Sequence, residues 1–355
     1  MGRTGSSMPP RRRAVRPRAV LAPGVALVAL LLTGAGCGGP SAPPPAPPAT
    51  GAQQQPSSAA PTPTAVVSPS AGPTPSPSPS SPAPAPSPTG HQRLRAMRTD
   101  VGRMVWTTLS GPRSGVQMRV WVWLPPQYDQ PAYAHTAFPA LMLFPGGSGA
   151  GYNTWVGEQY GARQLVARDR HVTPFVFVMP EMQLSERLDT ECADLPGQPK
   201  VGTFLAVDVR RMVEDNFRVM RDRSGWGAAG ASSGAYCATR LVFNHPDQYR
   251  AVVSIAGYYR IQTGLRGGKD PKVLATDPAV IARRDPPDVA VQLWTGDRNP
   301  YDLEDARRFL ALLRPPTKGS LEVQRGGGHL TSDFAKMMPS AFAFLSRTLA
   351  APAPS

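Results

Sequence analysis

The sequence has few cysteines, one long stretch without charge, and no long apolar run. Three cysteines among 355 residues exclude a small domain that depends on a disulfide framework. Residues 40–90 contain 18 prolines and no charged residue, so this stretch cannot bury a core. The apolar run Val20–Thr33 is interrupted by Pro23 and Gly24 and is too short to be a good membrane-spanning helix. The foldable part is therefore residues 91–355, about the length of one domain.

The positive charge is distributed unevenly. Of the net charge of +14, six charges are arginines that precede residue 37, and no acidic residue accompanies them. The rest of the chain has 32 of the 38 basic residues and all 24 acidic ones, and these are scattered rather than clustered. Such a pattern does not predict a surface that binds nucleic acid.

The first 36 residues are typical of an export signal. Residues 11–18 are rich in arginine, the apolar run Val20–Thr33 follows, and three small residues then precede Cys37. A junction of small residues and cysteine after an apolar run resembles the lipobox of bacterial lipoproteins. The resemblance implies a lipid on Cys37 and a location on the outer face of the cell membrane. The alternative is an ordinary secretory signal that is cleaved nearby, which gives a secreted protein.

Residues 38–90 alternate proline with alanine, serine and threonine. Such a chain forms mostly extended polyproline II helix, about 3 Å per residue, and acts as a semi-rigid spacer. After a lipid anchor, its natural role is to hold a domain away from the membrane. The expected organisation is a signal peptide in residues 1–36, a lipidated cysteine and spacer in residues 37–90, and a folded domain in residues 91–355.

From residue 104 the pattern alternates between strands and helices. Two strands, Met104–Leu109 and Gln117–Leu124, are expected to pair antiparallel across a turn. Further strands, several of them apolar runs typical of strands buried on both faces, are expected at 138–144, 173–179, 225–230, 250–255, 289–294 and 320–324. Helices are expected at 155–168, 203–216, 233–244, 302–313 and 339–349. This order predicts an α/β fold of the α/β-hydrolase type, with a mostly parallel sheet and helices on both faces.

The segment Gly230–Gly234, of sequence Gly-Ala-Ser-Ser-Gly, places a serine at a tight turn from a strand to a helix. Small residues suit this turn because the backbone is crowded there, and the helix N-terminus favours negative charge that forms beside it. The motif alone is common in chains rich in glycine, alanine and serine. A strand before it and a helix after it favour Ser232 as a nucleophile.

A nucleophilic serine requires a base and an acid that orients the base. Of the five histidines, His329 follows the last strand and three glycines, and it completes the chain order Ser, Asp, His expected for this fold. Two acids remain open. Asp297 lies directly at the end of the strand 289–294 and is the first choice. Asp302 is the alternative, although it can instead cap the helix that follows.

The loop Pro145–Gly149 is expected to help form an oxyanion hole. One donor is the backbone N–H of Ser233, and the second comes from this loop, with Gly147 as first choice and Gly146 as second. Glycine suits the position because the backbone must approach the substrate closely. The loop lacks the lysine of a phosphate-binding loop. No spacing of cysteine and histidine suggests a metal site, and we expect no cofactor.

Cys192 and Cys237 are both expected near the carboxyl edge of the sheet. We hypothesise a disulfide between them that fixes the loop 185–200 beside the active site. The alternative is two buried thiols, and export to an oxidising compartment favours the bond.

The block from Asn216 to Tyr259 resembles the family of α/β-hydrolases that includes esterase D, feruloyl esterases, enterochelin-esterase-like proteins and secreted mycolyltransferases. The Phe-Pro-Gly-Gly loop before Trp155 and the terminal Gly-Gly-Gly-His match as well. The resemblance implies a Ser–His–acid acyl-transfer enzyme with Ser232 and His329 in these roles. Many members carry Gly-x-x-Asp after the seventh strand, and that register places Asn299 where the acid would be. Both Asp297 and Asp302 therefore stay open.

These observations together predict a surface-anchored serine carboxylesterase that acts through an acyl-enzyme on a small-molecule or cell-envelope ester. One alternative is an acyltransferase of the mycolyltransferase type, which passes the acyl group to a sugar or lipid hydroxyl. The same catalytic residues serve both reactions, so the sequence does not separate them. A second alternative is a non-catalytic cell-wall-binding lipoprotein with a hydrolase fold.

Overall fold

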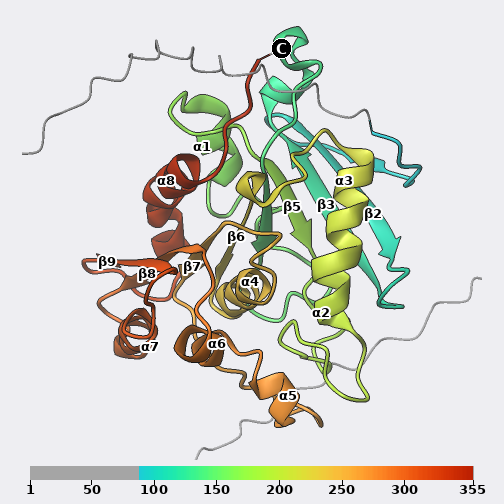
Figure 1. Cartoon of the computed structure of the whole chain (residues 1–355). Helices are drawn as coiled ribbons and strands as arrows, with labels where there is room; N and C mark the ends of the chain where they lie inside the picture. The colour runs from blue at the N-terminus through green and yellow to red at the C-terminus, as the bar shows by residue number, and fades with distance from the viewer. Residues whose placement is uncertain (1–87, 355) are drawn as a thin grey trace, which may run out of the picture. The chain divides into compact units, whose positions relative to one another are not determined.

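The computed structural model describes residues 88–354. The expected signal peptide, the lipidation of Cys37 and nearly all of the proline-rich spacer lie outside these residues. Within the described part, one sheet contains nine strands in the order β1-β2-β3-β5-β4-β6-β7-β8-β9 (Figure 1). The bounds of the strands are β1 (Arg95–Met97), β2 (Arg103–Ser110), β3 (Gln117–Leu124), β4 (Ala140–Phe144), β5 (Val176–Pro180), β6 (Trp226–Ala231), β7 (Ala251–Ile255), β8 (Ala290–Gly296) and β9 (Lys318–Gln324).

The sheet has an antiparallel edge and a parallel body. Strands β1, β2 and β3 pair antiparallel with one another, and β3 also pairs antiparallel with β5. From β5 to β9 all neighbouring strands are parallel. Every residue of β4, β5, β6 and β7 is buried, because helices cover both faces of the parallel part. The expected strands and the mostly parallel sheet are confirmed, while β1 was not expected.

Eight α-helices, three 3₁₀ segments and one π-helical segment lie between or after the strands of this part of the chain. The α-helices are α1 (Ala162–Arg168), α2 (Val201–Thr203), α3 (Arg210–Asn216), α4 (Ser233–Asn244), α5 (Pro271–Leu274), α6 (Pro278–Arg284), α7 (Pro300–Leu310) and α8 (Thr331–Thr348). The π-helical segment η3 (Phe204–Val209) joins α2 to α3, and the 3₁₀ segments are η1 (Pro126–Asp129), η2 (Pro131–Tyr133) and η4 (Arg223–Gly225).

Two apolar cores lie on the two faces of the sheet. On one face, α3, α4, α6 and α7 pack through side chains such as Val213, Val242 and Phe309. On the other face, α1 and α8 pack through side chains such as Val166 and Phe342. Figure 1 shows these helices on both sides of the strands. The doubly covered sheet predicted from the alternating strands and helices is therefore present.

Helix α8 begins eight residues earlier than we expected, at Thr331, and contains Pro339. A proline inside a helix removes one hydrogen bond and costs about 3 kcal/mol. Against this cost, Phe334, Met337 and Phe342 are all buried on one side of the helix. Burial of each large apolar side chain contributes roughly 1.5–3 kcal/mol, so the continuous apolar face outweighs the proline.

The expected helix 155–168 is shorter in the structure, where α1 begins at Ala162. The preceding residues are held as a loop by side chains that bind strand ends. The Nδ2 group of Asn153 donates to the carbonyl oxygens of Leu143 and Pro180, and Nε1 of Trp155 donates to that of Phe144. These bonds satisfy backbone oxygens at the carboxyl edge of the sheet, which a longer helix would leave unpaired.

Between residues 88 and 354, no helix is long and apolar enough to cross a membrane. No group of three or more histidine, cysteine and acidic side chains in this region is arranged to hold a metal ion.

Candidate active site

Ser232 occupies the tight turn between β6 and α4. Its backbone has φ 56° and ψ −122°, a left-handed conformation that is strained for a residue other than glycine. The two flanking glycines make this turn fit. A Cβ on Gly230 would lie 2.1 Å from the carbonyl oxygen of Gly234, and a Cβ on Gly234 would lie 2.3 Å from that of Pro145. The N–H of Ser232 donates to the carbonyl of Ile255 at 2.8 Å, which fixes the turn to β7.

Three side chains from different elements meet at this turn. The Oγ atom of Ser232 lies 3.0 Å from Nε2 of His329. The Nδ1 atom of the same ring lies 2.6 Å from Oδ2 of Asp302. His329 comes from the loop between β9 and α8, and Asp302 comes from the first turn of α7. In the tautomer that satisfies both contacts, Nδ1–H donates to Asp302 and Nε2 accepts from the serine hydroxyl.

The structure places Asp302, the alternative acid, and not Asp297, our first choice, against His329. Strand β8 extends two residues beyond its expected end, to Gly296, so Asp297 begins the next loop. Its carboxylate accepts a hydrogen bond of 2.7 Å from the N–H of Gly326, in the turn that precedes His329. The chain then turns into α7, whose first turn carries Asp302 to the imidazole.

Asn299 both caps α7 and contacts the carboxylate of Asp302. Its Oδ1 accepts from the N–H groups of Tyr301 and Asp302 and so caps α7, while its Nδ2 donates to Oδ2 of Asp302 at 2.8 Å. The signal in the sequence was an asparagine directly before a proline, the usual pair at the cap and first position of a helix. Asn299 therefore holds the carboxylate that faces His329.

The environment of His329 favours its protonated form. The hydrogen bond from its ring to Asp302 raises the pKa of His329 above its ordinary value, although partial burial opposes this shift. The side chain of His329 is 37% exposed and that of Asp302 is 15% exposed. The ring also meets Phe334 edge to face, with centroids 5.2 Å apart. The imidazole is thus fixed on two sides and open to solvent on another.

The loop after β4 passes directly beside the nucleophile. A Cβ on Gly146 would lie 3.7 Å from Cβ of Ser232. Gly147 has φ +74°, and its carbonyl accepts a hydrogen bond of 2.6 Å from the hydroxyl of Ser233. The hydroxyl of Tyr152 donates to the carbonyl of Gly146 at 3.0 Å. These bonds fix the backbone of the loop against the start of α4.

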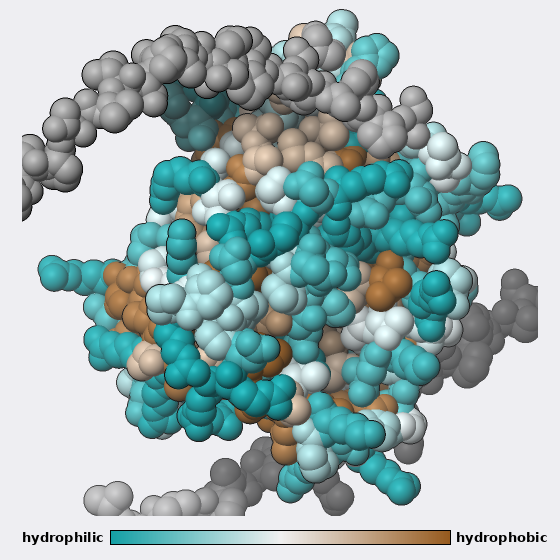
Figure 2. All heavy atoms as spheres, viewed as in Figure 1, coloured by the Kyte–Doolittle hydropathy of each residue, from teal (hydrophilic) through white to brown (hydrophobic). Residues whose placement is uncertain are grey.

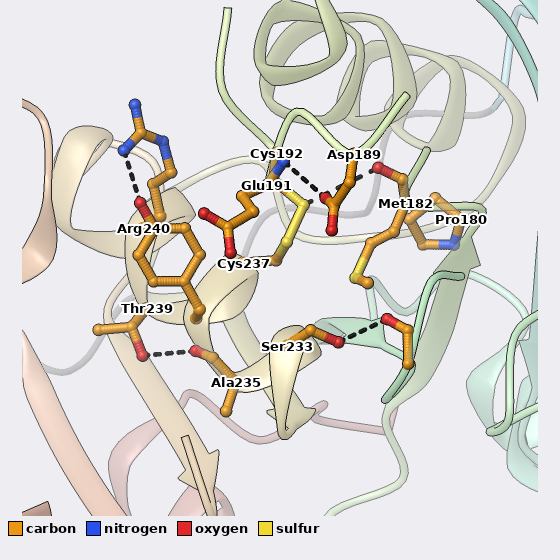
Figure 3. Close-up of a disulfide and its surroundings, with 12 residues drawn as sticks. Pro180, Met182, Asp189, Glu191, Cys192, Ser233, Ala235, Cys237, Thr239 and Arg240 are labelled. Atoms are coloured by element: carbon orange, nitrogen blue, oxygen red, sulfur yellow. Dashed lines mark hydrogen bonds between the residues drawn. A yellow bond between two sulfur atoms is a disulfide. The ribbon is translucent and has the colours of Figure 1, made fainter. Parts of the chain in front are cut away.

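Cys192 and Cys237 form a disulfide, as we hypothesised (Figure 3). Cys237 lies on α4 five residues after Ser232, and Cys192 lies in the loop that follows β5. The bond therefore fixes this loop to the helix that carries the nucleophile. Two consecutive residues of the loop, Glu191 and Cys192, have left-handed backbones with φ of 48° and 57°.

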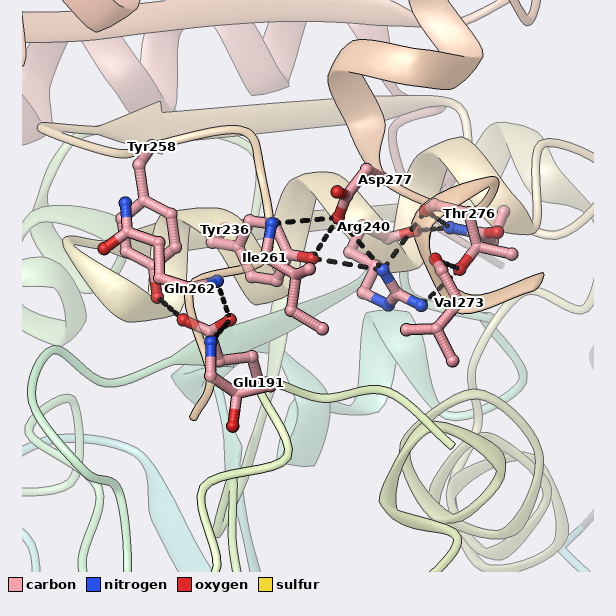
Figure 4. Close-up of polar contacts among 11 residues, drawn as sticks. Glu191, Tyr236, Arg240, Tyr258, Ile261, Gln262, Val273, Thr276 and Asp277 are labelled. Atoms are coloured by element: carbon pink, nitrogen blue, oxygen red, sulfur yellow. Dashed lines mark hydrogen bonds and ion pairs between the residues drawn. The ribbon is translucent and has the colours of Figure 1, made fainter. Parts of the chain in front are cut away.

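The carboxylate of Glu191 joins two loops of the site (Figure 4). It accepts hydrogen bonds from the hydroxyl of Tyr258 at 2.6 Å and from the N–H groups of Gln262 and Thr263 at 2.5 and 2.9 Å. Burial raises the pKa of Glu191. Because the donors follow β7 and Glu191 follows β5, the loops after these two strands are tied together. The sequence offers no signal for this contact, since its members are about 70 residues apart.

A second buried network holds the same loop to α4 (Figure 4). The Oδ1 atom of Asp277 accepts from the hydroxyl of Tyr236 at 2.6 Å and from the N–H of Ile261 at 3.0 Å. The guanidinium of Arg240 lies 3.5 Å from the same oxygen. The loop 257–263 is therefore held from two sides, by Glu191 and by Asp277.

A cavity of about 420 Å³ lies next to the disulfide, away from the serine. Its walls come from η3, α4 and α5 and include Val207, Leu241 and Val273. Neither Ser232 nor His329 lines it. The two cysteines form part of its wall. Ser232 and His329 therefore lie outside this cavity.

This chain is similar to known proteins in sequence and in structure. Residues 112–338 match the model of the family described as "Putative esterase". An uncharacterized protein of Corynebacterium glutamicum is 26% identical over 211 residues, which cover 57% of this chain and 48% of that protein. This chain thus aligns with about half the length of that relative.

Two solved structures show the fold. A ferulic acid esterase has a TM-score of 0.59 at 21% identity, over 70% of this chain and 100% of its own. An S-formylglutathione hydrolase from Agrobacterium tumefaciens has a TM-score of 0.59 at 13% identity, over 73% of this chain and 100% of its own. At these identities the two likenesses establish the α/β-hydrolase fold.

Proposed function

We propose that this chain, which belongs to the esterase family whose model matches residues 112–338, is a serine hydrolase of carboxylic esters. Its proposed catalytic triad is Ser232, His329 and Asp302. The observation that carries the proposal is the unbroken chain of contacts, 3.0 Å from Ser232 to His329 and 2.6 Å from His329 to Asp302. This is the geometry of a nucleophile, its base and the acid that orients the base.

The proposed reaction has two steps. Ser232 Oγ attacks the ester carbonyl carbon while its proton passes to Nε2 of His329. The tetrahedral intermediate then releases the alcohol, which takes that proton, and an acyl-enzyme remains. In the second step water attacks the acyl carbon and gives a proton to His329. The acid leaves, and Ser232 Oγ takes the proton back from the imidazole.

Asp302 stabilises the imidazolium that forms in each step. Its hydrogen bond to Nδ1 leaves Nε2 as the acceptor and raises the pKa of His329. Asn299 donates to the same carboxylate and caps α7, so it acts as a positioning residue. Asp302 also lies in the first turn of α7, where the helix dipole favours negative charge.

The oxyanion is proposed to bind the backbone N–H of Ser233 and that of Gly147. The N–H of Ser233 is the first of α4, a position that has no partner within its helix. The loop that carries Gly147 runs against Ser232 and is fixed by the bond between Ser233 Oγ and the Gly147 carbonyl. Each such donor contributes about 10²- to 10³-fold to the rate in enzymes of this type.

Export and anchoring remain proposals from the sequence. The arginine-rich start, the apolar run and Cys37 support a lipoprotein on the outer face of the cell membrane, with a proline-rich spacer before the enzyme. An ester of the cell envelope, or a small ester outside the cell, would then be the substrate. Transfer of the acyl group to a sugar or lipid hydroxyl uses the same residues, and no contact of the site favours it over hydrolysis.

Labelling with a fluorophosphonate probe tests the proposal. The full-length protein is expected to be labelled, and Ser232→Ala and His329→Ala are expected to abolish labelling. Ser110→Ala is the control, because it removes an exposed hydroxyl on β2, outside the proposed site, and should leave the label in place. Absence of labelling in the folded wild type, or labelling that persists in Ser232→Ala, would overturn the assignment of Ser232.

A further inference from the structure

Two exposed hydrophobic side chains lie directly beside the acid and the base. Leu330 follows His329 in the chain and is 65% exposed, and Tyr301 precedes Asp302 and is 80% exposed. Both belong to helix starts at the carboxyl edge of the sheet. Since adjacent residues are 3.8 Å apart at Cα, these two residues lie close to the acid and the base.

Two more exposed hydrophobic side chains belong to or adjoin the loop that passes beside Ser232. Tyr152 is 38% exposed, and its hydroxyl bonds to the carbonyl of Gly146. Leu184 is 37% exposed and follows Gln183, which pairs with Ala150 of the same loop. We call Tyr152, Leu184, Tyr301 and Leu330 the apolar collar.

The collar differs from ordinary surface hydrophobics in where its members lie. Eight large hydrophobic side chains are exposed between residues 88 and 354, and half of them form the collar. The other four are spread over β1, η3, α5 and β9. Single exposed side chains of that kind need no explanation, and Figure 2 shows hydrophobic atoms in small separate areas on the face drawn there. Four exposed hydrophobic side chains near one reacting serine indicate a surface that contacts another apolar surface.

The shape and charge of the site point to an extended partner. A pocket normally buries most of the surface of a dissolved ligand of drug size. Here the triad does not line the nearby cavity, and His329 is open to solvent. Side chains that point outward leave water only when another apolar surface covers them. Arg298 and Arg325 are exposed on the loops that lead to Asp302 and His329, and such cations favour anionic head groups.

We propose that the substrate is an ester carried in an anionic lipid layer, and that the apolar collar rests on this layer while Ser232 attacks the ester at its surface. The two collar tyrosines suit that position, since their rings are apolar and their hydroxyls polar. This inference rests on the proposed esterase function and names the substrate class for the same site.

The rate of tributyrin hydrolysis across the solubility limit of this ester tests the inference. The ester bond is the same in solution and in an emulsion stabilised with phosphatidylglycerol, so only the presence of a layer changes. For the wild-type full-length protein, the rate of hydrolysis is expected to rise in one step of about tenfold when the emulsion forms. The rise is expected because contact with the layer buries a few apolar side chains.

Variants of the collar separate it from the triad. Leu184→Ser combined with Leu330→Ser is expected to remove the step, and Tyr301→Ser is a second variant whose side chain has little packing to lose. Leu274→Ser is the matched control, because this leucine is also 37% exposed but lies on α5; it should keep the full step. All variants are compared in the full chain, so any effect of residues 1–87 is common to them.

The outcomes distinguish this inference from the proposed function. Hydrolysis of dissolved tributyrin without a step at the solubility limit would overturn the lipid-layer substrate and leave the esterase intact. An equal step in the double variant and in Leu274→Ser would also overturn it. Absence of any hydrolysis, together with absence of fluorophosphonate labelling, would overturn both.

Discussion

Asn299 donates a hydrogen bond of 2.8 Å from Nδ2 to Oδ2 of Asp302. The same oxygen lies 2.6 Å from Nδ1 of His329. One carboxylate oxygen thus accepts from an amide and from an imidazole, and the amide that holds it also caps the helix on which the acid sits. In the register of known esterases the acid would stand at position 299. Here Asn299 occupies that position, and its side chain holds the carboxylate of Asp302, three residues later.

Exchange of each candidate acid for its amide is expected to separate Asp302 from Asp297. Asp302→Asn should lower kcat by about three to four orders of magnitude, because the imidazole loses the partner that sets its tautomer. Asp297→Asn should lower it by less than about tenfold, since this side chain binds only the N–H of Gly326. Steady-state hydrolysis of p-nitrophenyl acetate measures both. A loss in Asp297→Asn as large as that in Asp302→Asn would contradict the assignment.

Asn299 is expected to affect activity and stability separately. Asn299→Ser retains an oxygen that can cap α7 but loses the donor to Asp302, so kcat should fall about tenfold while stability changes little. Asn299→Ala loses both, and the free energy of unfolding should fall by about 1 kcal/mol as well. Urea denaturation and the pH profile of kcat/KM report the two effects. An unchanged pH profile in Asn299→Ser would mean that the residue is only a helix cap.

The pH dependence of activity follows from the contact between His329 and Asp302. Only the neutral imidazole can take the proton of Ser232. Because the hydrogen bond to Asp302 raises the pKa of His329, kcat/KM should rise with pH to a midpoint above the ordinary histidine value of 6.5. In Asp302→Asn the midpoint should move to lower pH. A wild-type midpoint at or below 6.5 would contradict the contact.

The same pKa shift has a consequence for stability. The folded state holds the proton of His329 more tightly than the unfolded chain does. The protonated imidazole therefore stabilises the folded state fully below pH 6.5, and this stabilisation disappears as the pH rises through the raised pKa of His329. His329→Ala should remove this part of the pH dependence of unfolding. Because the side chain is partly exposed, the effect is expected to be small.

The contact between Ser232 and His329 was predictable from the sequence because the signals of both residues are local. A glycine-flanked serine between a buried strand and a helix has few structural solutions, and one histidine followed the last strand. The acid depended on where β8 ended and on how the chain turned into α7. The pair Asn299-Pro300 marked the helix start, but only the folded turn 324–328 shows that Asp302, rather than Asp297, faces the imidazole.

Other features were not predictable because they depend on packing between distant segments. The early start of α8 results from burial of Phe334 and Met337 against the sheet, which outweighs Pro339. The carboxylate of Glu191 meets donors about 70 residues away, and nothing in either segment announces the pairing. The disulfide was a sounder expectation, because two cysteines near one sheet edge leave few choices.

Loss of the disulfide between Cys192 and Cys237 is expected to lower the free energy of unfolding by about 2–4 kcal/mol, since the bond closes a loop of 45 residues in the unfolded chain. The double variant Cys192→Ser with Cys237→Ser, measured in urea, checks this value. Cys37→Ser is the matched control and should leave it unchanged. Alkylation of Cys192 and Cys237 in the purified protein without reductant would show that the bond is absent.

Glu191 is expected to control substrate affinity more than the chemical step. Its carboxylate holds Tyr258 and the N–H groups of Gln262 and Thr263, while the triad is built from other elements. In Glu191→Ala these donors lose a buried acceptor, so the loop 257–263 should loosen and KM should rise about tenfold while kcat changes less than threefold.

Glu191→Gln provides the rescue that distinguishes loop positioning from general destabilisation. The amide oxygen of glutamine can still accept from Gln262 and Thr263, and burial already disfavours the charged form of Glu191 by raising its pKa. We therefore expect the KM of Glu191→Gln to lie close to the wild-type value. Fluorophosphonate labelling should be retained in both variants. A fall in kcat equal to the rise in KM, or loss of labelling in Glu191→Ala, would show that Glu191 acts on the triad itself.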